Sequence, residues 1–275
     1  MSLNLEINYN ICNIRLTELI TGIRNLEELF IIAHQKNNAN IRPLGDSALV
    51  IQLGDGISPS IHEKVRNLSN LLEKEPFTGL IESVPSYNSL TIYYNPVAVY
   101  LSSTDKEALS PYKKVSAFIL ALIGKLGTNE TPEQRLLTIP VLYGGEFGPD
   151  LEYVASYHGL SVEKVVQIHS SNDYLVYMIG FAPGFPFMGG LDERIATPRK
   201  DSPRLAIAPG SVGIAGKQTG IYPLETPGGW QIIGRTPVDL FLPELSPPTM
   251  LQSGDRIRYV PITLEECAAY KEMKQ

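Results

Sequence analysis

Glycine and proline are concentrated in one stretch of the chain, residues 180–236, which holds 11 of the 23 glycines and seven prolines in 57 positions. Glycine allows a positive φ and a close approach of two backbones, whereas proline fixes φ and removes a backbone donor. Two kinds of structure need so many backbone constraints. One is a small β-barrel with tight corners, and the other is a loop region whose amides surround a ligand.

The charge distribution favours a ligand. The stretch 180–236 has six basic and four acidic residues, a net charge of +2, while the whole chain carries –6 and the remainder therefore –8. A locally cationic, glycine-rich surface on an acidic protein indicates a small anionic partner. A pI near 5.3 argues against nucleic acid, which requires a concentrated basic face.

Composition and termini place the chain among cytoplasmic proteins without a membrane span. Cys12 and Cys267 are far apart and form no metal-ligand spacing, which indicates free thiols in a reducing compartment. The N-terminal residues lack the basic and apolar regions of a secretory signal. The longest uncharged apolar run, 115–124, is too short to cross a bilayer.

The pattern of elements predicts an α+β protein with three parts. Residues 1–40 are rich in asparagine and read as an extension with one helix over roughly 17–35. Residues 41–130 alternate strand and helix signals, and with a last strand at 136–142 their order βαββαβ is that of a ferredoxin-like unit. Residues 131–275 contain short strands broken by glycine and proline, which indicates a closed or partly closed β-barrel.

The Gly-rich region and its approaches hold the candidate functional residues, although no generic nucleotide, hydrolase or metal motif is present. His169, at a predicted helix end, is a general base or else a histidine favoured by the helix dipole. Glu146 is a candidate acid, and Asp150 either a second acid or the cap of the next helix. Trp230 either stacks on a planar ligand or fills the barrel end. The candidate ligand-binding side chains are the guanidinium groups of Arg199, Arg204 and Arg235, the amide and hydroxyl of Gln218 and Thr219, and Ser211 in a potential backbone nest.

Several long motifs in fixed order resemble the family of Kip-type kinase inhibitors and 5-oxoprolinase B subunits, also called allophanate hydrolase subunit 1. The resemblance begins near Ile41 and continues to the C-terminus, leaving residues 1–40 uncovered. The motifs are YGGEFGPD (143–150), the step from His169 to Tyr174, MIGFAPGFPFMGGL (178–191), TPRKDSPR (197–204), SVGIAGKQTGIYP (211–223) and PGGWQIIGRTP (227–237).

The resemblance implies a ferredoxin-like N-terminal lobe and a cyclophilin-like β-barrel as the C-terminal lobe. It also implies a partner, the C subunit (allophanate hydrolase subunit 2), and a third component, the A subunit. Such complexes open 5-oxoproline to glutamate and consume ATP, which binds together with magnesium. This chain alone is then expected to be inactive, with His169, Glu146 and Arg204 as its catalytic candidates and no metal site of its own.

The same resemblance leaves two other functions open. One branch of the family inhibits the autophosphorylation of a sensor histidine kinase, and related domains form the carboxyltransferase part of a biotin-dependent urea carboxylase. The chain departs from the usual family pattern at Phe187-Met188, where Tyr-Leu is common, and at 207–210, where it reads Ile-Ala-Pro-Gly instead of Val-Pro-Ala-Gly. Both changes leave the details of substrate recognition open.

Overall fold

The computed structural model describes residues 39–102, 109–126 and 135–272, which form two compact units. Within these ranges, the first unit contains residues 39–55, 67–84, 89–102 and 109–126. The other contains 56–66, 85–88 and everything from 135. The segments 56–66 and 85–88 thus belong to the second unit, although the stretches of chain on either side of each belong to the first. The helix expected over 17–35 lies outside the described residues.

A four-stranded antiparallel sheet forms the centre of the first unit, with strands in the order β1-β2-β4-β3. Alternate residues of the central strands are apolar, so that one face is buried: Leu49, Ile51, Leu90 and Ile92 are all fully inaccessible. The strands are β1 (Asn40–Pro43), β2 (Ala48–Gln52), β3 (Leu80–Pro85) and β4 (Ser89–Tyr94).

The C-terminal half of α3 (Pro59–Lys74), together with α4 (Pro96–Leu101) and α5 (Pro111–Gly124), belongs to the same unit as this sheet. Asn95 caps α4 by accepting from the amides of Val97 and Ala98, and Ser110 caps α5 by accepting from that of Lys113. The apolar residues of α5 recur at helical spacing and form part of the core, because Val115, Ile119 and Leu122 are buried.

The fold class predicted from the sequence is confirmed, but one strand was assigned to the wrong unit. Residues Leu136–Tyr143 form β5, which lies in the barrel between β12 and β13. The fourth strand of the first sheet is instead β1, which is paired antiparallel to β2. The pattern of a single strand does not say which sheet it joins, because both sheets accept an apolar strand of this length.

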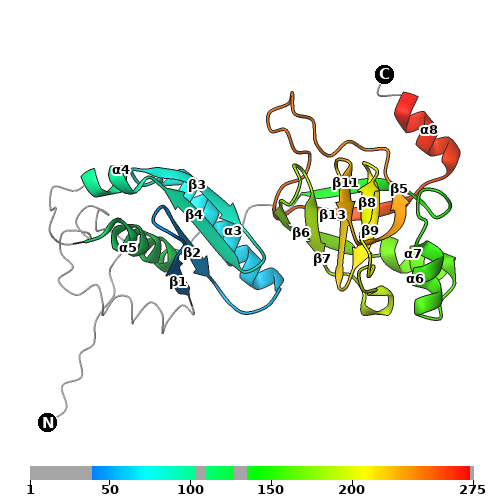
Figure 1. Cartoon of the computed structure of the whole chain (residues 1–275), viewed down its shortest axis with the longest axis horizontal. Helices are drawn as coiled ribbons and strands as arrows, with labels where there is room; N and C mark the ends of the chain where they lie inside the picture. The colour runs from blue at the N-terminus through cyan, green and yellow to red at the C-terminus, as the bar shows by residue number, and fades with distance from the viewer. Residues whose placement is uncertain (1–38, 103–108, 127–134, 273–275) are drawn as a thin grey trace, which may run out of the picture. The chain divides into compact units, whose positions relative to one another are not determined.

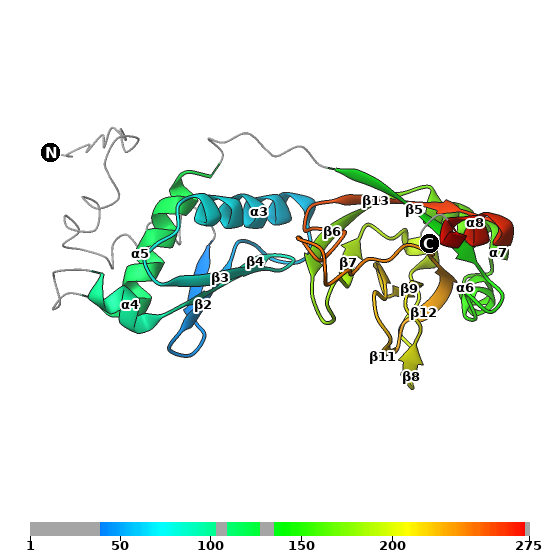
Figure 2. The same ribbon diagram turned by 90° about the horizontal axis from the view of Figure 1, so that it is seen from above.

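Seven strands close into a barrel in the second unit, in the order β10-β7-β6-β13-β5-β12-β9 (Figures 1 and 2). Strand β13 runs parallel to β5, and the other neighbouring strands pair in antiparallel fashion. Besides β5, the strands of the barrel are β6 (Asp173–Ile179), β7 (Pro186–Gly189), β9 (Ser211–Ala215), β10 (Gln218–Ile221), β12 (Gln231–Arg235) and β13 (Arg256–Pro261).

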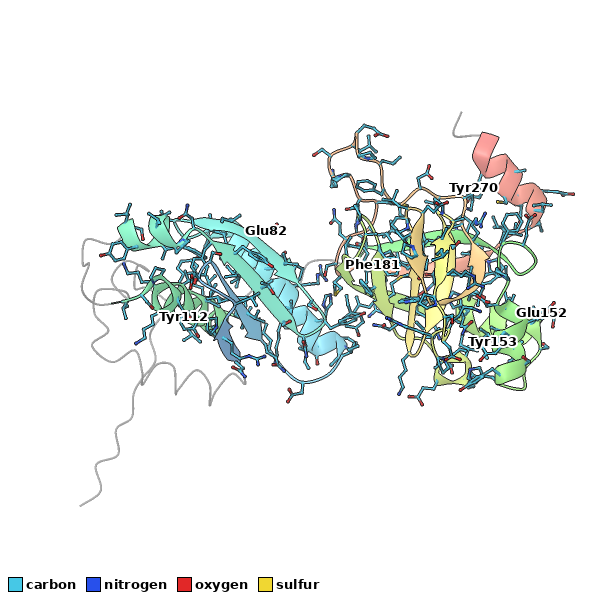
Figure 3. All side chains as sticks on the ribbon, in the orientation of Figure 1. Glu82, Tyr112, Glu152, Tyr153, Phe181 and Tyr270 are labelled. Atoms are coloured by element: carbon cyan, nitrogen blue, oxygen red, sulfur yellow. The ribbon has the colours of Figure 1, made fainter. Side chains whose placement is uncertain are left out.

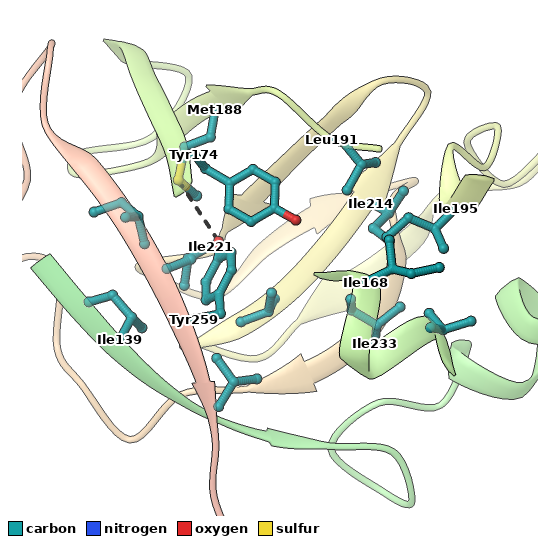
Figure 4. Packing of buried hydrophobic residues seen from close by; sticks show 14 of the residues in the cluster. Ile139, Ile168, Tyr174, Met188, Leu191, Ile195, Ile214, Ile221, Ile233 and Tyr259 are labelled. Atoms are coloured by element: carbon teal, nitrogen blue, oxygen red, sulfur yellow. Dashed lines mark hydrogen bonds between the residues drawn. The ribbon is translucent and has the colours of Figure 1, made fainter. Parts of the chain in front are cut away.

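Branched aliphatic side chains and two tyrosines fill the barrel (Figure 4). Val176, Ile214, Ile221 and Ile257 are fully inaccessible, and the Tyr259 hydroxyl lies 3.9 Å from the sulfur of Met188. The interior is therefore a packed core, and a ligand has to bind on the rim or the outer surface.

A second apolar cluster lies apart from that core and explains much of the glycine content. It consists of Ala182, Phe185, Ile207, Ala215, Tyr222, Trp230 and Ile232. A Cβ atom on Gly228 would lie 2.4 Å from the Tyr222 hydroxyl, and one on Gly220 would lie 2.9 Å from the Trp230 ring. These glycines admit large aromatic rings at close range, so tight packing accounts for part of the glycine-rich stretch.

Smaller elements surround the barrel. A two-stranded ribbon, β8 (Arg204–Ile207) and β11 (Thr226–Gly228), joins the second apolar cluster through Ile207. Helices α6 (Leu151–Tyr157) and α7 (Val162–Ser170) pack on the main core through Val154 and Val165, and η1 (Glu193–Ile195) is one short turn. Helix α8 (Leu264–Glu272) starts with a capping box, in which Thr263 and Glu266 exchange side-chain and amide hydrogen bonds. None of the described helices is long and apolar enough to span a membrane.

Candidate functional site

Asp150 is the centre of an ion cluster on the outer side of β12. Its carboxylate is nearly inaccessible and accepts from Arg204 Nη2 at 2.7 Å and from Lys200 Nζ at 3.2 Å through Oδ1. Its Oδ2 accepts from the amide of Ile232 at 2.7 Å. Burial raises the pKa of Asp150, but the hydrogen bonds and charges of these partners outweigh it and leave the pKa below its ordinary value.

The cluster bears on the expected roles of Asp150 as a helix cap and of Arg204 as a catalytic residue. Asp150 occupies the position before α6, yet it makes no side-chain cap there, because its oxygens are committed to β12 and to the two cations. Arg204 was predicted to be catalytic, and the structure places its guanidinium on a buried carboxylate. Its charge is therefore largely compensated within the protein, and its catalytic role stays a prediction.

Arg199 lies next to this cluster and is exposed. Its Cζ atom is 6.0 Å from the centroid of the Trp230 ring, a cation–π distance. Trp230 itself is buried in the second apolar cluster, in edge contact with Phe185, so its ring contributes to packing. Arg199 thus offers an exposed cation above an aromatic surface.

Gln218 of β10 and Tyr87 extend that surface. The amide of Gln218 donates to the Tyr87 hydroxyl, and the Tyr87 ring lies 5.3 Å from Tyr177 and 6.4 Å from Phe187. Burial raises the pKa of Tyr87 to about 12, although the hydrogen bond and the Arg199 charge act against the shift. A neutral tyrosine therefore takes part of the hydrogen-bonding capacity that Gln218 was expected to offer a substrate.

His169 is completely buried in a hydrogen-bond network inside the barrel. Its Nδ1 lies 2.7 Å from the Tyr143 hydroxyl and its Nε2 lies 3.0 Å from Thr219 Oγ1, while Tyr259 stacks on the ring at 4.6 Å. Because Thr219 also donates to the carbonyl of Gly213 at 3.0 Å, we assign the proton to Nε2 and make Nδ1 the acceptor.

Burial lowers the pKa of His169 to about 3, so the ring is neutral over the physiological range. Neither His169 nor Thr219 is accessible to a substrate. Their predicted roles in catalysis and binding are not tested by this geometry, but any effect has to act through the packing of the barrel rather than by direct contact.

The remaining candidates are Arg235, Ser211 and Glu146. Arg235 is the last residue of this strand, and Ser211 is its partner in register on β9. Glu146 is exposed in the turn that precedes Phe147. Trp230 and Arg235 are five positions apart, which in a strand is roughly 16 Å. The exposed and partly exposed candidates therefore divide into two surface groups, whereas His169, Thr219 and Ser211 are buried.

Sequence reasoning missed several residues and misplaced one. Lys200 and Tyr87 belong to the surface groups, and Tyr143 holds His169. His62, a residue that the charge pattern alone would place at the surface, is buried with its ring 4.9 Å from Tyr177, and desolvation lowers its pKa to about 4. These contacts join positions up to 131 apart in the chain, so no local pattern could have identified them.

Phe181 is a non-glycine residue at φ 69° whose side chain is 68% exposed (Figure 3), and a β-carbon makes this conformation unfavourable. Within the part of the chain that the structure describes, no group of three or more histidine, cysteine or acidic side chains could hold a metal ion.

Comparison with known proteins identifies the class first. A family model described as carboxyltransferase domain, subdomain C and D, matches residues 39–251. The crystal structure of the protein TTHA0988 has a TM-score of 0.66 and 32% identity; the match covers 82% of this chain but only 40% of that longer one. The Kluyveromyces lactis urea amidolyase matches with a TM-score of 0.68 over 85% of this chain and 15% of that one; at 19% identity this likeness supports the fold alone.

Two relatives identify the family within this class. The 5-oxoprolinase B subunit of Bacillus subtilis (strain 168) is 47% identical over 232 residues, which covers 84% of this chain and 96% of that protein. The 5-oxoprolinase B subunit of Escherichia coli O157:H7 is 40% identical over 219 residues, with 79% and 94% covered. The chain belongs to the family of 5-oxoprolinase B subunits.

Proposed function

We propose that this chain is the B subunit of an ATP-dependent 5-oxoprolinase, which opens 5-oxoproline to glutamate together with the A and C subunits. The observation that carries the proposal is the 47% identity to a protein of that name over nearly its whole length. The α+β fold with its barrel agrees with this family, and the exposed cations of the barrel unit agree with an anionic substrate.

The reaction explains why partners are needed. A lactam is a stable amide, and transfer of the γ-phosphoryl group of ATP to the lactam oxygen, with release of ADP, would make the ring carbon electrophilic. Addition of water and cleavage of the C–N bond would then leave an acyl phosphate, which a second water hydrolyses to glutamate and phosphate. We assign ATP and its magnesium ion to a site shared with the partner proteins. The part of this chain that the structure describes offers cations for an anion, in particular Arg199 and Arg235, but no cluster of metal-ligating side chains.

The described residues also explain the expected inactivity of the isolated chain. The histidine that the sequence favoured as a base, His169, is buried and neutral. A general base must come within hydrogen-bond reach of the proton that it abstracts. The chain therefore contributes binding and positioning to the proposed complex, while the partner proteins complete the reacting centre.

Co-expression with the A and C subunits tests the proposal. We expect the purified three-component complex to form glutamate from 5-oxoproline only when ATP is present. Preparations that lack this chain, and this chain alone, should show no turnover. An inactive three-component complex would contradict the proposed reaction, and turnover by the isolated chain would contradict the requirement for partners.

Carboxyl transfer is the second candidate function, because the matched family model carries that description. A putative urea carboxylase from Emericella nidulans is 25% identical, but this chain covers only 22% of it. The same complex can be assayed for transfer of the carboxyl group from carboxybiotin to urea. Such transfer, without ATP-dependent opening of 5-oxoproline, would favour this second candidate.

A further inference from the structure

Arg235 carries a charge that the described part of the protein does not neutralise. Its side chain is half-buried, and its Nε atom is inaccessible and lacks a hydrogen-bond partner among the described residues. Leaving a buried donor unpaired costs about 1–3 kcal/mol. In the same unit, four other arginines pair with aspartates: Arg135 with Asp255, Arg194 with Asp192, Arg204 with Asp150 and Arg258 with Asp173.

The surroundings of Arg235 hold its guanidinium group in place. Its Cζ atom lies 5.5 Å from the centroid of the Phe147 ring, so the aromatic face covers one side of the cation. Gly210 leaves room on another side, because a Cβ atom there would lie 3.3 Å from Arg235 Cγ and 2.4 Å from the carbonyl oxygen of Thr236. The arginine is therefore positioned without being neutralised.

Uncommitted hydrogen-bond donors accompany the cation. Ser211 lies opposite Arg235 in the β9–β12 register, so the two side chains are neighbours on one face of the sheet. Ser211 is itself buried, so it supports the arginine side chain from within the sheet. In the turn that contains Phe147, the amides of Gly144, Phe147 and Gly148 donate to backbone carbonyls, whereas those of Gly145 and Glu146 donate to no described residue.

We propose that Arg235 and the turn at Phe147 form a binding site for a small carboxylate, separate from the Asp150 cluster. The fork of a guanidinium group matches the two oxygens of a carboxylate, and the amides of Gly145 and Glu146 add further donors. The ring of Phe147 favours a compact ligand with an apolar edge. The identity of this ligand as the carboxylate of 5-oxoproline rests on the proposed function.

Ligand binding to the full chain tests this site by titration calorimetry. We expect 5-oxoproline to bind the wild type, and 2-pyrrolidone, the same lactam without its carboxylate, to bind far more weakly. The Arg235→Gln variant should lose at least about tenfold in affinity for 5-oxoproline, the effect of one lost charge-assisted hydrogen bond. Arg194→Gln, which removes an exposed cation that pairs with Asp192, is the matched control and should change affinity by less than about threefold.

Three results would overturn the proposal. They are an Arg235→Gln variant that melts normally and binds 5-oxoproline like the wild type, a wild type that shows no saturable binding, and tighter binding of inorganic phosphate than of 5-oxoproline at the same arginine. Arg235→Lys keeps the charge but not the fork, so an intermediate affinity supports bidentate recognition. Failure of the proposed enzyme function is a separate observation, since it appears as an inactive three-component complex whatever the isolated chain binds.

Discussion

Replacing Asp150 by asparagine removes one charge from the most buried ion cluster in the described residues, and we expect it to destabilise the barrel unit. The variant keeps an oxygen for the Ile232 amide but weakens the hydrogen bonds from Arg204 and Lys200. Hydrogen bonds to a charged group contribute about 1.5–3 kcal/mol. Both cations retain some contact with water, with 28% and 33% of their side chains exposed, so the expected loss is near the lower end, about 2 kcal/mol.

The single tryptophan makes this loss measurable. Trp230 is buried, and its carbonyl accepts from Arg204 Nη1 at 3.5 Å, so its fluorescence reports unfolding of the unit that contains the cluster. Urea titration at neutral pH should show the lower free energy of unfolding, and the melting temperature should fall by about 4–8 °C.

The stability that the Asp150 carboxylate contributes depends on pH. The folded pKa of Asp150 is below its ordinary value, so the carboxylate stabilises the protein above the unfolded pKa, about 4. This contribution disappears as the pH falls through the folded pKa. The stability difference between the wild type and the variant should therefore shrink on acidification below about pH 4.

A surface pair provides the control. Asp173 pairs with Arg258 at 2.7 Å, with 49% of the arginine side chain exposed, and its replacement by asparagine should cost less than about 1 kcal/mol. If Asp150→Asn is no more destabilising than Asp173→Asn, the cluster does not hold β12 and the loop of Lys200 together, and the reasoning is refuted.

Further predictions concern the buried histidines, one glycine, His169 in catalysis and the N-terminal segment. The pKa values of His62 and His169 are lowered to about 4 and about 3, so only the unfolded chain takes up their protons between those values and its own pKa of 6.5. The free energy of unfolding should then fall by about 1.4 kcal/mol per pH unit for each histidine between about pH 6.5 and 4; an equally steep decrease in a His62→Gln, His169→Gln double variant would contradict this. Gly148→Ala should destabilise the protein by more than about 2 kcal/mol in urea titration, since its Cβ atom would lie 2.1 Å from the carbonyl oxygen of Ile233; wild-type stability would disprove the close approach. His169→Ala should lower turnover by the complex at least about tenfold without unfolding the chain, and an unchanged rate would leave this residue a role in stability alone. Deleting residues 1–38, which the family model does not match, should leave turnover by the complex intact; loss of turnover in a folded complex would show that the segment is required.

Local patterns in the sequence were enough to predict the family, the fold class and several individual elements. The spacing of the apolar residues from Val115 to Leu122 is typical of a buried helix face, and the Thr263–Glu266 spacing is typical of a helix start, because each depends on residues within one or two turns. The concentration of glycine and proline at 180–236 likewise predicted tight backbone turns in a barrel, although it did not separate packing from ligand binding.

The three-dimensional arrangement was needed to show which strands share a sheet and which candidate residues share a surface. Strand β5 joins the barrel through partners about a hundred residues away, and Arg204 meets Asp150 across 54 positions. The predicted residues looked like one site because they are close in sequence, but β12 separates Arg199 and Arg204 from Arg235, and the barrel encloses His169. Which charge is neutralised and which is left for a ligand depends on these long-range pairings, and they are set by packing rather than by local sequence.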